Sequence, residues 1–559
     1  MSVRHSFLEA TARQRALALL DPGSFREACP PQRAWQSPHL ALLDLPQALD
    51  DGIVTASGTL NGHVVLLAAQ EGAFNGGSVG EIHGAKLLGL LQAALSLRPA
   101  GVLLLIDSGG VRLHEANAGI LAISEVARAV LAVRAAGIPV LALLGGRCGA
   151  FGGMGIVSCL CDRVLMSEEA RLGLSGPEVI ETVKGRAEFD SHDRALVWRV
   201  TGGKTRRALG DAHRLVDDAM EAFRTAAGQE LEQLRARPLQ APDLAALEAQ
   251  QRSWLARHQD FAGAQDSPPI LAARLRAPAP ADWDGAAAFE NALLPLAPAP
   301  ADAAGVPAGQ PPLQALGAED QAWADHVFGC GRHRLAAADG FLAGSADVAH
   351  GRVWVIGTRG AAAIDAALAL RLARAVLDAI AHDRASAACS PLLLLADTQG
   401  QALSRHQELL CLNGALAHLA QCVDLARRER HPLLTLVRNQ AVSGGFLSFG
   451  MLGDLICALP QAEIRVMDLR AMARVTRIPL ERLQQLALTA PAFAPGAANF
   501  HSLGGVHQLW EAQQDWPVAL AQALAGIDAD DRRAALGQQR GGRKLARQVA
   551  DQVRAALGA

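Results

Sequence analysis

Short, almost wholly apolar runs alternate along the chain with longer segments that have the periodicity of helices. In the first half, an apolar run over 101–110 precedes a helical pattern over 116–136 and a second apolar run over 138–146. Apolar strands that alternate with helices are typical of a mostly parallel sheet covered by helices. The pattern therefore predicts an α/β fold.

The same order of elements recurs roughly 290 residues further along the chain. A strand over 390–400, a helical pattern over 406–429 and a strand over 431–439 repeat the first set. The other matching features are the strand-end aspartates Asp107 and Asp397, the glycine pairs Gly152-Gly153 and Gly444-Gly445, and the strands over 162–174 and 454–467. This shared order predicts two domains related by internal duplication.

An alanine- and proline-rich stretch over 266–318 separates the two halves and lacks periodic apolar positions. Such a composition is typical of an extended linker. We therefore expect a first domain over 1–265, a second over 319–530 and a helical C-terminal tail over 531–559.

The composition narrows the classes of protein to consider. Half of the 559 residues are hydrophobic and the net charge is −3, which fits a globular protein and gives no electrostatic case for nucleic-acid binding. The nine cysteines are scattered, and the closest pair, Cys159 and Cys161, lacks the spacing of a zinc site. No signal peptide or membrane span is apparent, so we expect free thiols and a cytoplasmic location.

Six glycines lie within residues 145–155, between a predicted strand and a predicted helix. The first turn of a helix has unpaired N–H groups and the positive end of the helix dipole, and both favour a negatively charged oxygen. Glycine lets a substrate approach the backbone closely. The N–H groups of Phe151, Gly152 and Gly153 are therefore candidates for binding an oxyanion, and a glycine-rich packing turn is the alternative.

A second glycine cluster over 71–86 also follows a predicted strand and leads into a helix. Two such turns in one domain can supply the two donors of an oxyanion hole. A branched side chain placed at Gly153 is then expected to enter the space of the bound thioester while the fold stays largely intact.

At these clusters the sequence resembles the crotonase-like carboxyltransferase superfamily, whose members act on acyl thioesters. The stretches that carry the resemblance are FNGGSVGEIHGAK (74–86), DSGGVRLHE (107–115) and GLSGPEVIE (173–181). The resemblance implies two domains of the ββα-spiral type with an active site between them.

The closer resemblance is to biotin-independent malonate decarboxylase. Residues 1–265 are similar to its beta subunit, most specifically over 147–181 and 188–204. The second half is similar to its gamma subunit, through residues 357–360, 439–451 and 490–510. Those subunits are usually separate chains, whereas here both occur in one.

This resemblance implies that a malonyl thioester on an acyl carrier protein is decarboxylated to the acetyl thioester through an enolate. No cofactor or metal is bound directly, because the family's carrier itself holds the substrate on a phosphoribosyl-dephospho-CoA group. The implied partners are the carrier protein and an alpha subunit that exchanges malonyl for acetyl. No nucleic acid or membrane is implied, and a homodimer is left open.

The expected site places the thioester carbonyl near Gly152 and Gly153, with help from Gly76 and Gly77. Ser443, Gly444 and Gly445 of the second half are expected to face the departing carboxylate.

Side-chain roles are more open. His83 is a candidate proton donor to the enolate carbon, because its ordinary pKa lies near neutral pH. A solvent-exposed pair of His83 and Lys86 on the helix surface is the alternative. The expected substrate contacts are Ser78, Lys86, Phe151 and Gln440. Gln440 and Ser443 can instead satisfy loop hydrogen bonds, and we interpret Asp107 as a structural turn residue.

Three other functions compete with this interpretation. A biotin-dependent acyl-CoA carboxyltransferase or decarboxylase subunit shares the fold and the glycine pairs, although the chain lacks an A-M-K-M biotin-carrier segment. A serine peptidase needs a serine at the start of the helix, where this chain has FGGMG (151–155). A non-catalytic scaffold fits the second half better than the first, because the second half has only the shortened GTRGAAAID (357–365) in place of the first glycine cluster.

Overall fold

The computed structural model describes residues 5–33, 35–43, 51–237, 239–276, 285–296, 310–349 and 351–559. The first half contains a seven-stranded sheet in the order β1-β2-β3-β4-β5-β6-β7. Strands β2 and β3 form an antiparallel hairpin, and the sheet from β3 to β7 is parallel. The strands are β1 (Arg26–Ala28), β2 (Ile53–Leu60), β3 (His63–Gln70), β4 (Gly101–Ile106), β5 (Val140–Leu144), β6 (Arg163–Ser167) and β7 (Arg214–Val216).

The second half contains a ten-stranded sheet with the same plan. An antiparallel pair, β10 and β11, leads into the parallel strands β13, β14, β15 and β17, while β12 and β16 pair with β13 and β14. The strands are β8 (Gln314–Ala315), β9 (His333–Ala338), β10 (Phe341–Val348), β11 (Gly351–Thr358), β12 (Ala362–Ile364), β13 (Leu392–Gln401), β14 (Leu433–Val442), β15 (Leu455–Ala458), β16 (Glu463–Arg465) and β17 (Gln508–Leu509). The predicted α/β class and duplication are confirmed.

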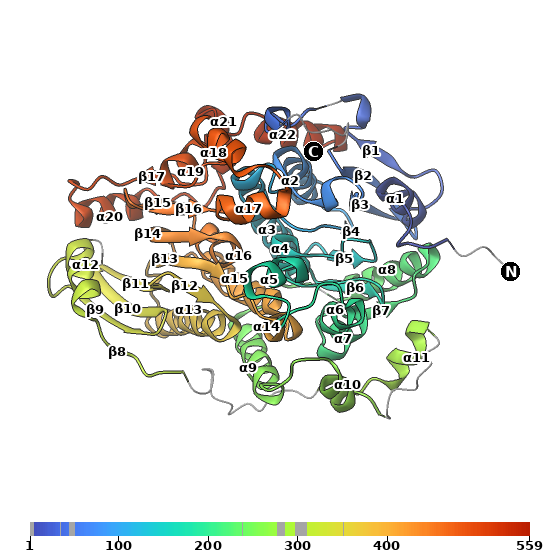
Figure 1. Cartoon of the computed structure of the whole chain (residues 1–559), viewed down its shortest axis with the longest axis horizontal. Coiled ribbons are helices and arrows are strands. Elements are labelled where there is room, and N and C mark those ends of the chain that lie inside the picture. The colour runs from blue at the N-terminus through green and yellow to red at the C-terminus, as the bar shows by residue number, and fades with distance from the viewer. Residues whose placement is uncertain are drawn as a thin grey trace.

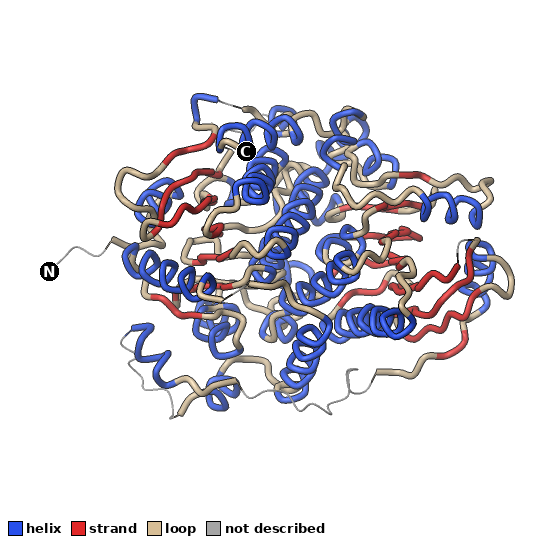
Figure 2. Tube along the Cα trace, turned by 180° about the vertical axis from the view of Figure 1, so that it is seen from behind, coloured by secondary structure: helices blue, strands red, loops and turns tan. Residues whose placement is uncertain are grey.

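The two sheets lie at opposite ends of the molecule with helices between them (Figure 1). Figure 2 shows the same arrangement from behind. The inner helices are α2 (Glu81–Leu97), α3 (Ala116–Ala135), α4 (Gly152–Leu160), α13 (Ala366–Ser386), α15 (Leu412–Arg428) and α16 (Ser443–Leu447). The outer helices are α1 (Ala12–Leu19) and α8 (Met220–Arg235) on the first sheet, and α12 (Ala318–Phe328) and α20 (Trp516–Ala525) on the second.

Alternation along the central strands explains these layers. In β4, Val102 and Leu104 face the inner helices, while Leu103 and Leu105 face α1 and α8. Strands buried on both faces therefore read as continuous apolar runs in the sequence. The inner helices of both halves contribute to one hydrophobic core, so the halves are not separate globular units.

Helix α3 is long and apolar enough to cross a membrane by length and composition, and 94% of its apolar window is buried inside the protein. It is therefore a core helix of the fold.

The predicted linker differs from the structure where it is described. Helices α10 (Pro268–Arg274) and α11 (Gly285–Ala292) pack on the first half, where Ile270 and Phe289 are buried. Apolar positions spaced along short, alanine-rich segments were too sparse to predict these helices. Residues 277–284 and 297–309 of the predicted linker lie outside the described residues.

Two further helices pack across the boundary between the halves. From the first half, α9 (Leu244–Asp260) packs on α13 and α15 of the second. In the predicted helical tail, α21 (Arg533–Gln539) is followed by α22 (Ala546–Leu557), which packs on α2 of the first half. The remaining helices are α5 (Pro177–Lys184), α6 (Arg194–Thr201), α7 (Gly203–Leu209), α14 (Arg405–Leu409), α17 (Leu469–Thr476), α18 (Leu480–Thr489) and α19 (Ala497–Ser502), with 3-10 turns at Pro31–Arg33, Leu40–Leu43, Asn75–Gly77 and Gly450–Leu452.

A buried ion pair fastens the C-terminal segment to α3. The Arg543 guanidinium contacts both carboxylate oxygens of Glu125, at 2.9 and 2.5 Å, and also donates to the Leu503 carbonyl at 2.8 Å. Both side chains are almost fully buried. Loss of one partner leaves an uncompensated buried charge.

We predict that Arg543→Ala lowers the free energy of unfolding by about 3–5 kcal/mol, the usual cost of breaking a buried pair. Chemical denaturation measures it. The double variant Arg543→Leu, Glu125→Leu is the control, because it removes both charges and is expected to be less destabilised than the single variant. An Arg543→Ala chain as stable as the wild type would mean that the pair contributes nothing to this junction.

Candidate functional site

The two glycine clusters of the first half meet at the carboxyl edge of the first sheet. The loop that follows β4 joins them: the N–H of Gly109 donates to the carbonyl of Gly76 at 2.8 Å. On its other side, the N–H of Phe151 donates to the carbonyl of Ser108 at 2.9 Å. Main-chain bonds therefore hold the start of α4 and the 71–86 cluster against one loop.

The structure narrows the set of N–H groups that can bind an oxyanion. Phe151, Gly152 and Gly77 each donate to a carbonyl, those of Ser108, Leu174 and Phe74, at 2.7–2.9 Å. This corrects the expectation that these three groups are open donors. Within the described part of the chain, the N–H groups of Gly153 and Gly76 make no hydrogen bond. Gly153 is buried at the start of α4, whereas Gly76 is exposed.

The environment of Gly153 also differs from the expectation. A Cβ at this position would lie 2.6 Å from Cγ2 of Ile123 in α3 and 3.0 Å from Cδ1 of Leu447 in α16. A side chain there would push into the packing between the halves and not into an open turn. The glycine is required because two other helices approach its backbone closely.

The second glycine pair comes close to the same place. A Cβ on Gly444 would lie 3.3 Å from Cδ1 of Leu174, and the Gly444 N–H donates to Oε1 of Gln401 at 3.1 Å. Ser443 has a φ of +51°, and Gly445 packs against Gly400. Helix α4, which begins at Gly152, and helix α16, which begins at Ser443, thus meet between the halves.

His83 and Lys86 are not a solvent-exposed pair, because both are buried. The ring nitrogens of His83 contact Nε2 of Gln70 at 3.0 Å and the carbonyl of Asp51 at 3.2 Å. Burial, with Arg112 nearby, holds the pKa of His83 well below its usual range. A neutral ring engaged on both sides is poorly suited to protonate a substrate, so we do not assign His83 that role.

The other predicted side chains have definite surroundings. The Ser78 hydroxyl donates to the Asn75 carbonyl at 2.6 Å, and the ammonium of Lys86 lies 5.6 Å from the centre of the Trp35 ring. The Phe151 ring lies under the Arg171 guanidinium at 5.6 Å. These contacts are internal to the first half, so none of them by itself indicates substrate binding.

Gln440 and Asp107 occupy the carboxyl ends of strands. Gln440 lies half-buried in β14 opposite Glu463, and its side chain makes no hydrogen bond within the described residues. Asp107 accepts from the Arg15 guanidinium at 2.8 Å and from the Cys148 N–H at 2.7 Å. Those two bonds fit the structural role expected for Asp107.

Sequence reasoning missed the polar residues that join the halves at the start of α4. The Glu408 carboxylate accepts from the N–H groups of Leu174 and Ser175 at 2.8 and 2.7 Å, and Asn413 donates to the Gly155 carbonyl at 3.2 Å. Gln401 reaches the Ser175 hydroxyl at 3.4 Å. These contacts span more than 200 residues, so no local sequence signal could reveal them.

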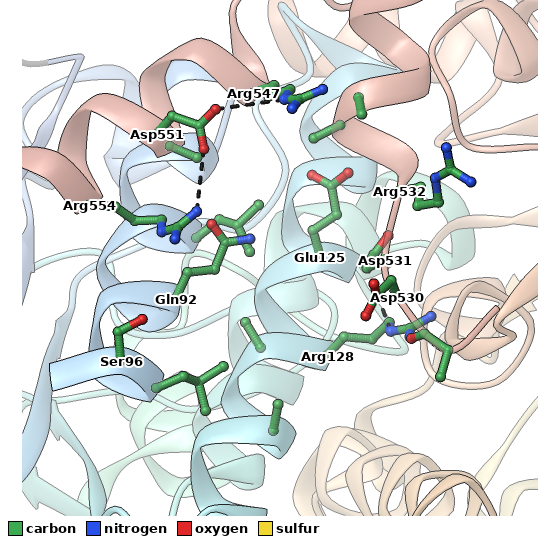
Figure 3. A pocket seen from close by; sticks show the side chains of 18 of the residues that line it. Gln92, Ser96, Glu125, Arg128, Asp530, Asp531, Arg532, Arg547, Asp551 and Arg554 are labelled. Carbon is green, nitrogen blue, oxygen red and sulfur yellow. Dashed lines mark hydrogen bonds and ion pairs between the residues drawn. The ribbon is translucent and has the colours of Figure 1, made fainter. Parts of the chain in front are cut away.

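A cavity of about 830 Å³ lies elsewhere, between α2, α3, α15 and the C-terminal segment (Figure 3). Its lining has five arginines and five acidic residues, and several are paired, such as Arg128 with Asp531 and Arg554 with Asp551. Because the opposite charges are matched, the cavity has no surplus charge to attract an ionic substrate.

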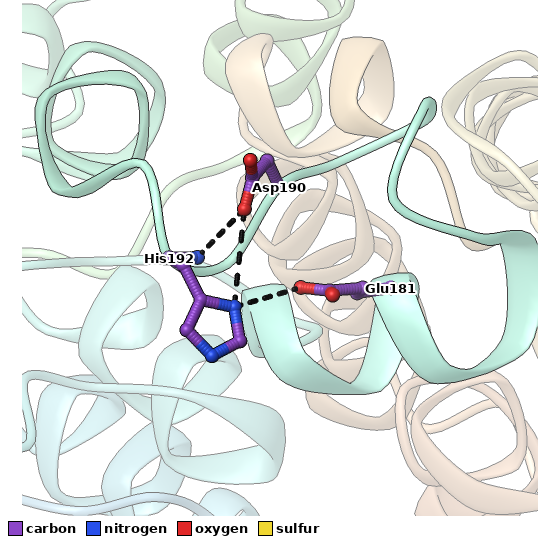
Figure 4. A group of neighbouring side chains, drawn as sticks. All are labelled: Glu181, Asp190 and His192. Carbon is purple, nitrogen blue, oxygen red and sulfur yellow. Dashed lines mark hydrogen bonds and ion pairs between the residues drawn. The ribbon is translucent and has the colours of Figure 1, made fainter.

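Glu181, Asp190 and His192 place three potential metal-ligand atoms within 4.8 Å of one another (Figure 4). Each carboxylate already has a partner, because Ser191 donates to Glu181 and Arg186 donates to Asp190. The His192 side chain is 79% exposed. We interpret the group as a surface hydrogen-bond cluster.

Two protein families match this chain, one in each half. The carboxyl transferase domain matches residues 5–228, and the malonate decarboxylase gamma subunit matches residues 359–557. The two matches fall on either side of the predicted linker.

Two similar proteins come from Malonomonas rubra. The malonyl-S-ACP:biotin-protein carboxyltransferase MADC is 45% identical over 234 residues, which are 39% of this chain and 73% of that protein. The corresponding protein MADD is 32% identical over 169 residues, 28% of this chain and 58% of that protein. Among solved structures, one chain of a Pseudomonas malonate decarboxylase hetero-tetramer in complex with malonate is 40% identical to this chain. The alignment covers 52% of this chain and 97% of that chain, with a TM-score of 0.43.

Proposed function

The chain belongs to the malonate decarboxylase family of carboxyltransferases, and we propose that it converts a malonyl thioester on an acyl carrier protein into the acetyl thioester and CO2. In this proposal both halves are crotonase-like carboxyltransferase domains, and the enzyme acts as a carboxy-lyase. The beta-like and gamma-like parts, usually separate, are joined here in one chain.

The observation that carries this proposal is the N–H of Gly153, which has no hydrogen-bond partner among the residues that the structure describes. It lies at the start of α4, where the positive end of the helix dipole favours negative charge. It is also buried where the two halves meet, so its interaction with an oxyanion is weakened little by water. We assign this N–H to the thioester oxygen, with the exposed N–H of Gly76 as the second donor.

The reaction needs little more than this arrangement. The bond between the α-carbon and the carboxylate carbon breaks, CO2 leaves, and the electron pair moves to the thioester oxygen as an enolate forms. A proton then adds to the α-carbon and gives the acetyl thioester. Donors already placed where the negative charge develops lower the barrier, because they stabilise the transition state more than the substrate.

The second half supplies the other wall of the site in this proposal. Ser443, Gly444 and Gly445 face the carboxylate end of the malonyl group, and Gln440 lies beside them on β14. Fixed backbone dipoles that replace water around the carboxylate favour its departure as neutral CO2. In this proposal Phe151, Ser78 and Lys86 of the first half also contact the substrate.

The proposed assembly follows the family. The carrier protein presents the substrate on a phosphoribosyl-dephospho-CoA arm, and an alpha subunit exchanges malonyl for acetyl on that arm. No cofactor binds directly to this chain in the proposal, and the complex is placed in the cytoplasm.

Carboxyl transfer to biotin is the second candidate, and it is favoured by the similarity to the two malonyl-S-ACP:biotin-protein carboxyltransferases of Malonomonas rubra. Both candidates share the enolate and differ in the fate of the carboxyl group. In the second candidate it moves to a biotin carrier protein and is not released directly as CO2.

We predict CO2 release from malonyl-carrier at an unchanged rate when avidin or EDTA is present. Avidin captures biotin and EDTA captures divalent metals, and neither takes part in the proposed reaction. Radiolabelled CO2 from carboxyl-labelled malonyl-carrier is the readout. Complete loss with avidin would favour the biotin-dependent candidate, and complete loss with EDTA would require a metal.

A further inference from the structure

We propose that Glu408 is a positioning residue for the oxyanion site, through which the second half sets the geometry of the glycine turn in the first. This inference rests on the proposed function, because it assumes that the start of α4 binds the thioester oxygen. Glu408 lies in α14 of the second half, whereas the glycine turn at the start of α4 lies in the first half.

The contact between Glu408 and the first half is direct and buried. Its two carboxylate oxygens accept from the N–H groups of Leu174 and Ser175, one each, at 2.8 and 2.7 Å. The Glu408 side chain is fully buried. A Cβ on the neighbouring Gly173 would lie 2.8 Å from the Glu408 carboxylate, so the carboxylate fits closely against the backbone of this loop.

The loop transmits this contact to α4. The carbonyl of Leu174 accepts from the N–H of Gly152 at 2.7 Å, and the N–H of Gly173 donates to the Ala150 carbonyl at 3.1 Å. Gly152 directly precedes Gly153 and has a left-handed φ of +57°. The Leu174 carbonyl thus fixes Gly152, and the position of Gly152 sets the direction of the following N–H, that of Gly153. Because Glu408 holds the N–H of Leu174, it acts on the Gly153 N–H through this loop.

Glu408 is itself fixed from the first half by Arg206. The Arg206 guanidinium donates to the main-chain carbonyls of Glu408 and Leu409, at 2.5 and 3.1 Å, and to the carbonyl of Leu172 in the same loop at 2.9 Å. Asp211 accepts from Arg206 at 3.3 Å and from Arg257 at 2.6 Å. One buried network thus joins α7, α9, α14 and the 172–175 loop.

Burial raises the pKa of Glu408 to about 7, against the opposing effect of the two N–H donors and of Arg206. Other charged or titratable groups lie near these elements. They include Asp211, Arg257, His258 and Cys411, as well as Glu188, which accepts from the Arg405 N–H, and His406, whose ring contacts the Ala264 carbonyl. A proton on Glu408 converts one of the two acceptor oxygens into a hydroxyl. The pair of bonds to the loop is therefore complete only in the ionised form, above about pH 7.

The raised pKa of Glu408 also determines how its contribution to the stability of the fold changes with pH. The folded chain binds the proton more tightly than the unfolded chain between about pH 4.5 and 7. The contribution of Glu408 to stability is therefore complete below pH 4.5 and is lost as the pH rises through 7. Ionisation costs stability and, in the same pH range, completes the positioning of the glycine turn.

The test is the pH profile of kcat for the full chain with malonyl-carrier, measured for wild type, Glu408→Gln and Glu408→Asp. We expect wild-type kcat to rise with pH through a midpoint near 7. Glu408→Gln turns an N–H donor toward one of the loop N–H groups, so its kcat is expected to fall at least about 10-fold above pH 8. Its profile should also lose the inflection near pH 7.

Glu408→Asp keeps an ionisable carboxylate with a shorter reach. It is expected to retain the inflection and to recover part of the lost kcat, which a purely structural defect would not do. It also serves if Glu408→Gln fails to fold. Glu188→Gln is the matched control, because Glu188 accepts from a backbone N–H of the other half but makes no hydrogen bond to α4 among the described residues. This control should keep the wild-type inflection.

The outcomes separate this inference from the proposed function. A wild-type chain that does not decarboxylate malonyl-carrier contradicts the proposed function itself. An active wild type with an unchanged Glu408→Gln profile overturns the inference alone. The inference is likewise overturned if Glu408→Gln is slower yet keeps the inflection, or if a folded Glu408→Asp chain loses it.

Discussion

Gly153→Pro is expected to lower kcat/KM at least about 100-fold relative to Gly153→Ala, when both chains also carry Ile123→Ala. Alanine keeps the N–H of residue 153, whereas proline removes it. The expected loss is the usual scale for one oxyanion-hole donor.

The Ile123→Ala background is needed because of the packing around Gly153. A Cβ at 153 would lie 2.6 Å from Cγ2 of Ile123, an atom that alanine lacks. Proline is tolerated in the first turn of a helix, where the N–H has no intrahelical partner. The N–H of Gly153 makes no hydrogen bond within the described residues, so its removal breaks none of the bonds described there.

Thermal unfolding of both double variants controls for a general packing defect. Equal melting temperatures with unequal kcat/KM assign the difference to the N–H. Comparable kcat/KM in two folded variants would mean that the glycine serves only the close approach of α3 and α16.

The second large effect is expected when the halves are separated. Residues 1–296 expressed alone should turn over malonyl-carrier at least about 100-fold more slowly than the full chain, because the fragment lacks Glu408, Asn413 and the Ser443–Gly445 wall. A chain cut at Gly309, which lies outside the described residues, should instead give two fragments that co-purify and stay active.

The expectation for the cut chain rests on the crossing helices. Helix α9 of the first fragment packs on α13 and α15, and α22 of the second packs on α2, so each fragment covers apolar surface of the other. Co-purification and CO2 release from the cut chain are the readouts. If residues 1–296 alone matched the full-length rate, the shared site would be wrong and the second half would be a scaffold.

The main features of the fold can be predicted from the sequence. Apolar runs such as 101–110 are strands with both faces buried, and burial on both faces is what makes such runs easy to recognise. The positions of the glycine clusters after strands are also predictable, because tight turns and close backbone approaches require glycine at particular positions in the sequence.

Other features of the site depend on contacts that no local pattern records. Whether an N–H at Gly152 or Gly153 is open depends on the carbonyl of Leu174, which a separate loop brings into place. The surroundings of His83, buried between Gln70 and Asp51, are likewise set by tertiary packing. Periodicity indicates that a helix face is buried but does not identify its neighbours.

The central claim is that this single chain decarboxylates a malonyl thioester without biotin. Its most direct test is mass spectrometry of the carrier's thioester arm after incubation with the full chain and avidin. We predict that the malonyl arm loses the mass of one CO2 and becomes the acetyl thioester. An arm that stays malonyl, or that becomes acetyl only when a biotin protein is supplied without avidin, would contradict it.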